Sequence, residues 1–258
     1  MARTKQRLKT SEFLELHPRC CYCNGSRAAQ ERDHAPARII FRDKQGPEDL
    51  EFPSCPECNR ATAISEQVAA FYIRAFDSTT VPITQEEFDK LVSGLCNNAP
   101  DAVPYQTYDQ NFAYLDEPDQ IITVPPKARA HIDLVGTKLL YALHYRATGK
   151  IANPTQRRVV IWAQAGTEAA QTVIGNAEQW FDKREVGKRR NVDLGNQFCY
   201  RTGYSENHGY FGLQMSFGEA LVFFCILGPA KPMVKLKPKP PLYVHLNKLG
   251  AALQPRKA

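Results

Sequence analysis

Four cysteines arranged in two C-x-x-C pairs are the side chains of this sequence best suited to chemistry. Cys20 and Cys23 form the first pair, and Cys55 and Cys58 form the second. A two-residue gap lets both sulfurs of one turn face a common centre, and two such turns supply the four thiolates of a tetrahedral structural zinc site. Cys21 lies only two positions from Cys23, which suits a shared site less well, so we do not expect it to be a ligand. A redox dithiol is the alternative, and it would fit a single pair better than two.

The 31 residues between the two pairs carry a second set of reactive side chains. Asp33 and His34 are adjacent there, and Asn59 directly follows the second pair. Histidine can take a proton from water, whereas carboxylate and amide oxygens are ligands that Mg²⁺ accepts. Phosphodiester hydrolysis needs both, because a general base supplies only about 10²–10⁴-fold in rate and a cation must stabilise the developing charge.

Four features follow one another between about residues 18 and 76. They are Asp-His, a proline two residues on, an acidic residue before a leucine, and C-x-x-C-Asn opening a helix. This segment resembles the HNH (ββα-metal) endonuclease family, in the variant with two C-x-x-C zinc knuckles. The resemblance implies that His34 is the general base and that Asp33 and Asn59 bind a catalytic Mg²⁺ or similar ion. The family usually has Asn before the leucine. This chain has Asp49, which can orient the imidazole or join the metal but cannot donate as an amide does.

Two of these residues have simpler alternatives. His34 can instead be a histidine satisfied within the zinc module, or itself a zinc ligand. Asn59 can be a helix cap, a position that Asn often occupies.

Basic residues suggest an anionic partner. The formal net charge is +6, and no acidic residue follows Glu219, whereas seven lysines and arginines do. Arg38 and Arg60 lie close in sequence to the predicted site, and Lys188, Arg189 and Arg190 form a basic run. We expect these side chains to contact the phosphates of DNA, with RNA left open. The alternative is that they are solvated surface side chains.

The composition is that of a globular protein, with 258 residues, 43% hydrophobic and 23% charged. No run of 18 apolar residues is present, so we expect no membrane span. The first 30 residues contain no apolar segment of a secretory signal. We therefore expect a cytoplasmic location, where spaced cysteines more often bind metal than form disulfides.

Periodicity and turn signals predict an α+β fold. Helices are expected over 11–16, from about 56 to 76, from Thr84 with Glu87 as its capping partner, and over 129–147. Strands are expected over 158–163, 197–204, 210–217 and 221–228. We divide the chain into a zinc-stapled HNH nuclease module (1–78), a helix and irregular linker (79–128), and a C-terminal α+β domain with an antiparallel meander and a basic tail (129–258).

The expected function is therefore a metal-dependent HNH endonuclease that hydrolyses phosphodiester bonds of DNA. The family's habits suggest a part in restriction or in defence against phages and mobile elements. The alternative is a catalytically silent, zinc-containing protein that binds nucleic acid.

Overall fold

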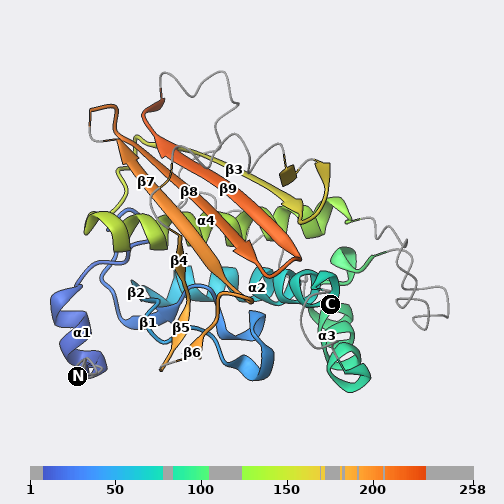
Figure 1. Cartoon of the computed structure of the whole chain (residues 1–258). Coiled ribbons are helices and arrows are strands. Elements are labelled where there is room, and N and C mark those ends of the chain that lie inside the picture. The colour runs from blue at the N-terminus through green and yellow to red at the C-terminus, as the bar shows by residue number, and fades with distance from the viewer. Residues whose placement is uncertain are drawn as a thin grey trace.

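The computed structural model describes residues 8–77, 84–104, 124–168, 170–171, 181, 184–190, 192–205 and 207–230. The basic tail after residue 230 and part of the expected linker lie outside these residues. The described part is α+β. In Figure 1 the long helix α4 (Pro126–Thr148) lies between a twisted antiparallel sheet and an N-terminal group of elements that includes α2 (Pro56–Phe76).

The N-terminal group is a short hairpin followed by a helix. Helix α1 (Thr10–Leu16) precedes strand β1 (Glu31–His34), and two 3₁₀ turns, η1 (Arg38–Ile40) and η2 (Arg42–Lys44), lead to β2 (Glu51–Ser54). The two strands pair antiparallel, with Asp33 opposite Phe52 and His34 opposite Glu51. Helix α2 starts directly after Cys55, with Pro56 in its first turn, where proline costs no hydrogen bond.

The predicted start of the next helix is confirmed. Helix α3 (Gln85–Asn98) begins after Thr84, whose hydroxyl accepts a hydrogen bond from the Glu87 amide at 3.3 Å. The short η3 turn (Pro100–Ala102) follows it. Tyr72 of α2 donates to the Ala102 carbonyl at 2.7 Å, and this bond ties η3 back to α2.

Helix α4 is longer and more deeply buried than the sequence suggests. It ends at Gly149, which adopts φ +66°, a conformation that favours glycine. The sequence predicts a helix over 129–147, and the structure buries residues on both sides of it, His131 and Lys138 among them. The reason is that α2 covers one side and the sheet covers the other. At Gly136 a Cβ atom would lie within 3 Å of Val160 and Phe223, so this position needs glycine.

The sheet has five strands in the order β3-β9-β8-β7-β4, all antiparallel. Their bounds are β3 (Arg157–Gln164), β4 (Glu185–Val186), β7 (Cys199–Ser205), β8 (Tyr210–Phe217) and β9 (Leu221–Gly228). A separate ribbon pairs β5 (Lys188–Arg189) with β6 (Val192–Asp193). The predicted meander is confirmed, within two residues at each strand end.

Buried side chains form one continuous cluster across the described residues, from the cysteines through α2 and α4 to the sheet. The expected division into an N-terminal module and a C-terminal domain stays a prediction. What the packing shows is that α4, assigned to the second unit, completes the core of the first.

Candidate functional site

The four predicted cysteines come together. The sulfurs of Cys20, Cys23, Cys55 and Cys58 all lie within 4.8 Å of one another, and all four side chains are buried. Cys21 is buried too but does not belong to this group, as its spacing predicts. The cluster is therefore placed to hold a metal ion, and it is the only such group of three or more His, Cys, Asp or Glu side chains among the described residues.

Local backbone geometry builds both halves of the cluster. After the first pair the chain turns back on itself, with Asn24 at φ +56° and Gly25 at φ +72°, and the Gly25 amide donates to the Cys20 carbonyl. Cys55 caps the N-terminus of α2, so Cys58 lies in its first turn.

The crowded thiols compete for protons. The pKa of Cys23 is lowered, mainly by hydrogen bonds from Cys20 and Cys58, whereas that of Cys58 is raised by the same kind of contact with Cys20 and Cys23. A bound divalent cation would relieve this competition, because it stabilises thiolates together.

Adjacent residues of β1 point to opposite faces of the hairpin, as in any strand. Arg32 and His34 share one face with Glu51. Glu31 and Asp33 share the other, which packs toward α2 and α4. The two neighbouring residues that the sequence places in one site, Asp33 and His34, therefore have different surroundings.

On the first face, His34 lies beside a carboxylate. Its Nε2 is 3.4 Å from Oε1 of Glu51, and the other oxygen of Glu51 is 3.2 Å from Nε of Arg32. The His34 side chain is 18% exposed. A carboxylate in this position can hold the ring and stabilise the imidazolium that forms when His34 takes a proton.

Glu51 also borders a cavity of about 430 Å³. Its walls come from α1, β2 and the end of α4, and they include His17, Tyr145 and Arg146. The Tyr145 hydroxyl and Nδ1 of His17 lie 2.8 Å apart. Burial, followed by the charge of Arg32, lowers the pKa of His17, so this ring is neutral at pH 7. The cavity combines the guanidinium of Arg146, which pairs with Asp49 at 2.9 Å, with hydrogen-bonding groups. His34 does not line the cavity but contacts Glu51 in its wall.

On the second face, Asp33 is only 7% exposed and is paired with a lysine of α4. Oδ2 of Asp33 lies 2.7 Å from Nζ of Lys138, which also contacts the Glu66 carboxylate and, at 3.2 Å, the Thr62 hydroxyl. Burial alone would lower the pKa of Lys138, but Asp33 and Glu66 outweigh it and raise this pKa, so the ammonium stays charged. Burial raises the pKa of Glu66 despite the lysine.

Of the two predicted Mg²⁺ ligands, Asp33 does not fit a divalent-ion site as it stands. The Asp33 carboxylate already contacts an ammonium, and the Asn59 side chain donates from Nδ2 to Oε2 of Glu31 at 2.8 Å. Asn59 is not the cap of α2, because that position belongs to Cys55. Its place in the first turn agrees with the sequence, and the contact with Glu31 uses its side-chain nitrogen, not the oxygen that would bind a metal.

Asp49 precedes β2 and is not among the paired residues of the hairpin. It is exposed and accepts from Arg146, which contacts its carbonyl at 2.7 Å and its carboxylate at 2.9 Å. The carboxylate opposite His34 belongs instead to Glu51, two residues later. Whether Asp49 acts on His34 or on a metal stays a prediction.

The predicted nucleic-acid contacts fall in two places. Arg38 and Arg60 are exposed on η1 and α2. The run at 188–190 packs against the loop before β2: Arg189 lies 3.5 Å from the Glu48 carboxylate, and the Glu48 amide donates to the Lys188 carbonyl. The Arg190 amide donates to Glu48 at 3.2 Å. Tertiary structure thus carries a distant basic segment to the hairpin. In Figure 1 the β5–β6 ribbon runs beside β1 and β2.

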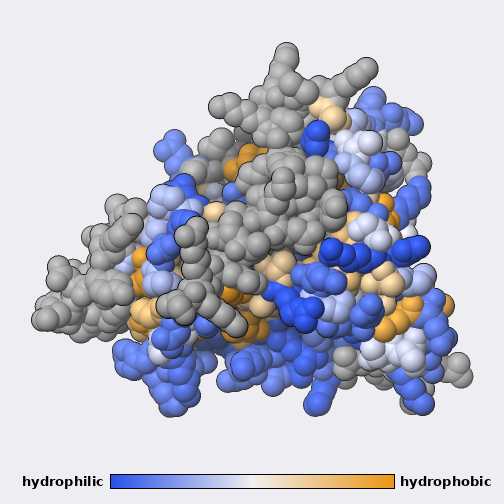
Figure 2. Space-filling view, turned by 180° about the vertical axis from the view of Figure 1, so that it is seen from behind, coloured by the Kyte–Doolittle hydropathy of each residue, from blue (hydrophilic) through white to orange (hydrophobic). Residues whose placement is uncertain are grey.

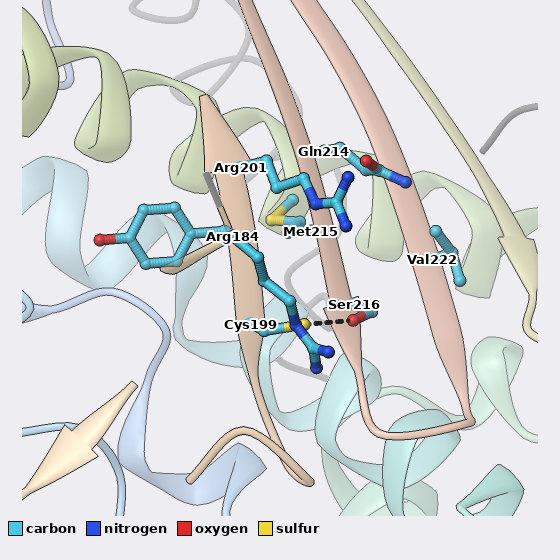
Figure 3. A pocket seen from close by; sticks show the side chains of 8 residues that line it. Arg184, Cys199, Arg201, Gln214, Met215, Ser216 and Val222 are labelled. Atoms are coloured by element: carbon cyan, nitrogen blue, oxygen red, sulfur yellow. Dashed lines mark hydrogen bonds between the residues drawn. The ribbon is translucent and has the colours of Figure 1, made fainter. Parts of the chain in front are cut away.

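A second cavity, of about 200 Å³, lies on the face of the sheet that points away from α4 (Figure 3). Arg184 and Arg201 extend over it, and Sγ of Cys199 lies 2.9 Å from Oγ of Ser216. The described residues that line it include no carboxylate and no histidine.

Sequence reasoning missed two residues that contact the hairpin motif, Glu51 of β2 and Lys138 of α4. Glu51 could have been found from the register, because it stands opposite His34 once β1 and β2 pair. Lys138 could not, since it belongs to a helix 105 positions after Asp33. Its one signal is a charge between the apolar positions Val135 and Leu139.

Comparisons with protein-family models, curated proteins and solved structures find no match. Among the described helices, none has the length and apolar character that a membrane span requires. On the face shown in Figure 2, hydrophilic residues dominate the lower edge, and hydrophobic residues show in small separate patches.

Proposed function

We propose that this protein is an HNH-type endonuclease that hydrolyses phosphodiester bonds of DNA, with a structural zinc ion held by Cys20, Cys23, Cys55 and Cys58. The observation that carries the proposal is His34 at the end of β1, facing Glu51 beside a cavity that contains Arg146. The order β1, β2, α2, with the four-cysteine cluster clamping the hairpin to the helix, supports the resemblance found in the sequence.

In the proposed reaction, His34 takes a proton from a water molecule whose oxygen attacks the phosphorus atom. The bond between phosphorus and the leaving ester oxygen breaks, and that oxygen gains a proton from solvent. Glu51 stabilises the charged imidazole. Arg146, which pairs with Asp49, lines the cavity and can contact the phosphate, and the ribbon with Lys188 and Arg189 offers further contacts to the DNA backbone.

Supercoiled plasmid, incubated with the zinc-loaded protein in the presence and absence of Mg²⁺, tests the proposal. We expect the parent to nick or linearise the plasmid, and His34→Ala to slow cleavage by at least about 100-fold, since a general base supplies about 10²–10⁴-fold. His208→Ala is the matched control, because this histidine is exposed in the turn between β7 and β8. Equal cleavage by His34→Ala and the parent would refute the nuclease assignment.

A catalytically silent, zinc-containing nucleic-acid-binding protein is the second candidate. The pairing of Asp33 with Lys138 favours it, because the expected metal ligand is engaged. It predicts DNA binding that weakens steeply with salt, through release of counterions, without any cleavage.

A further inference from the structure

The ammonium of Lys138 lies among three oxygen-bearing side chains. It pairs with the Asp33 carboxylate at 2.7 Å and donates hydrogen bonds to Glu66 and, at 3.2 Å, to the Thr62 hydroxyl. Its side chain is 2% exposed, and the ring of Tyr22 lies 5.4 Å from Nζ.

The surroundings of this ammonium have the chemistry of a site for a hard cation. Glu31 and Asp33 share a face of β1, and Asn59 and Glu66 face it from α2. The buried oxygens around the ammonium, from two carboxylates and a hydroxyl, are of the kind that Mg²⁺ takes as ligands. The cation that lies against Asp33 and Glu66 is supplied by the chain itself, from α4.

We infer that Lys138 takes the place of the catalytic divalent ion on this side of the hairpin, so that Asp33 binds an internal ammonium and not Mg²⁺. The inference deepens the proposed function. It rests on that proposal, because only an HNH-type nuclease is expected to have a catalytic ion at this place. A divalent ion beside Lys138 would meet a buried like charge and would have to displace it from Asp33. Lys138 is thus a positioning residue that holds β1 against α2 and α4.

Binding of Mn²⁺, measured by electron paramagnetic resonance on the zinc-loaded full chain, tests this without using nuclease activity. We expect the parent and Asp33→Asn to bind Mn²⁺ equally weakly. Lys138→Ala empties the position between two carboxylates, and it should bind one Mn²⁺ at least tenfold more tightly than the parent. Lys138→Arg keeps the positive charge and should bind as weakly as the parent.

Two outcomes would overturn the inference: a stoichiometric Mn²⁺ in the parent that Asp33→Asn removes, or a folded Lys138→Ala that gains no Mn²⁺ affinity. If Lys138→Ala is unstable, its melting temperature with and without Mn²⁺ gives the same answer, since a bound ion stabilises the folded state. If Mn²⁺ raises the melting temperature of this variant alone, the inference is supported. If the melting temperature does not rise, the inference is contradicted. The plasmid assay decides separately whether the protein is a nuclease.

Discussion

The two faces of one short hairpin do different work. On the face of Asp33, charges are buried and matched: an ammonium lies between two carboxylates, out of reach of solvent. On the face of His34, the contacts are looser, the ring is partly exposed, and Glu51 opens onto a cavity. Two adjacent residues of a sequence motif can therefore differ in role, because a strand sends neighbours to opposite sides. We expect the first face to contribute mainly to stability and the second to the proposed reaction.

The largest effect on either face should come from the metal cluster that clamps the hairpin. Cys58→Ser removes one of four ligands, and small zinc modules owe on the order of 10 kcal/mol of folding free energy to the ion. We expect loss of zinc and unfolding of the N-terminal elements, measured by elemental analysis and circular dichroism. Cys21→Ser is the control, because it alters a buried thiol outside the cluster and should keep the zinc. Well-folded parent protein without zinc would contradict the prediction.

The second-largest effect should be a loss of stability when the buried charges on the Asp33 face are changed. Lys138→Met leaves two buried carboxylates without their cation, and breaking a buried pair this way costs about 3–5 kcal/mol. The triple variant Lys138→Met/Asp33→Asn/Glu66→Gln removes all three charges and should recover much of this loss. Urea unfolding of zinc-loaded protein measures both. If the single variant is as stable as the parent, the cluster does not hold the fold.

The His34 face should respond in activity more than in stability. Glu51→Gln keeps the shape of the side chain but removes the charge that stabilises protonated His34, so plasmid cleavage should slow by about tenfold. Glu57→Gln, an exposed carboxylate in the first turn of α2, is the control and should cleave at the parent rate. Unchanged cleavage by Glu51→Gln would place the chemistry away from this face.

The smallest expected effect is on the pH dependence of stability. It comes from the histidines of α4 and not from either face of the hairpin. Burial lowers the pKa of His131 and of His144 to about 4, so both rings are neutral in the folded chain. The unfolded chain binds more protons below its histidine pKa of about 6.5, so stability is full above that pH and declines as the pH falls toward 4.

His144→Phe should reduce this decline. Between pH 7.5 and 5.5 it should lose roughly 1 kcal/mol less than the parent in urea unfolding, because each pKa unit corresponds to about 1.4 kcal/mol. His208→Ala, which alters an exposed histidine, should follow the parent. Identical losses in His144→Phe and the parent would mean that His144 is not held neutral by burial.

Signals between residues close in sequence determined the cysteine cluster and many of the helices and strands. The spacing of the cysteines predicted which four come together, because two-residue gaps fit turns that share a centre. The Thr84–Glu87 capping pair, the glycine after α4 and the period-two runs of the meander likewise predicted their elements, since each depends on neighbours in sequence.

Only the tertiary structure decided which partner each motif residue has. Asp33 meets Lys138 because α4 packs across α2, and no periodicity reports which helix of a chain will do so. The Lys188–Arg190 run meets Glu48 for the same reason. Buried charges are matched by whichever opposite charge the packing delivers, and that depends on contacts over a hundred residues apart, whereas turns, caps and strand alternation depend on residues only a few positions away.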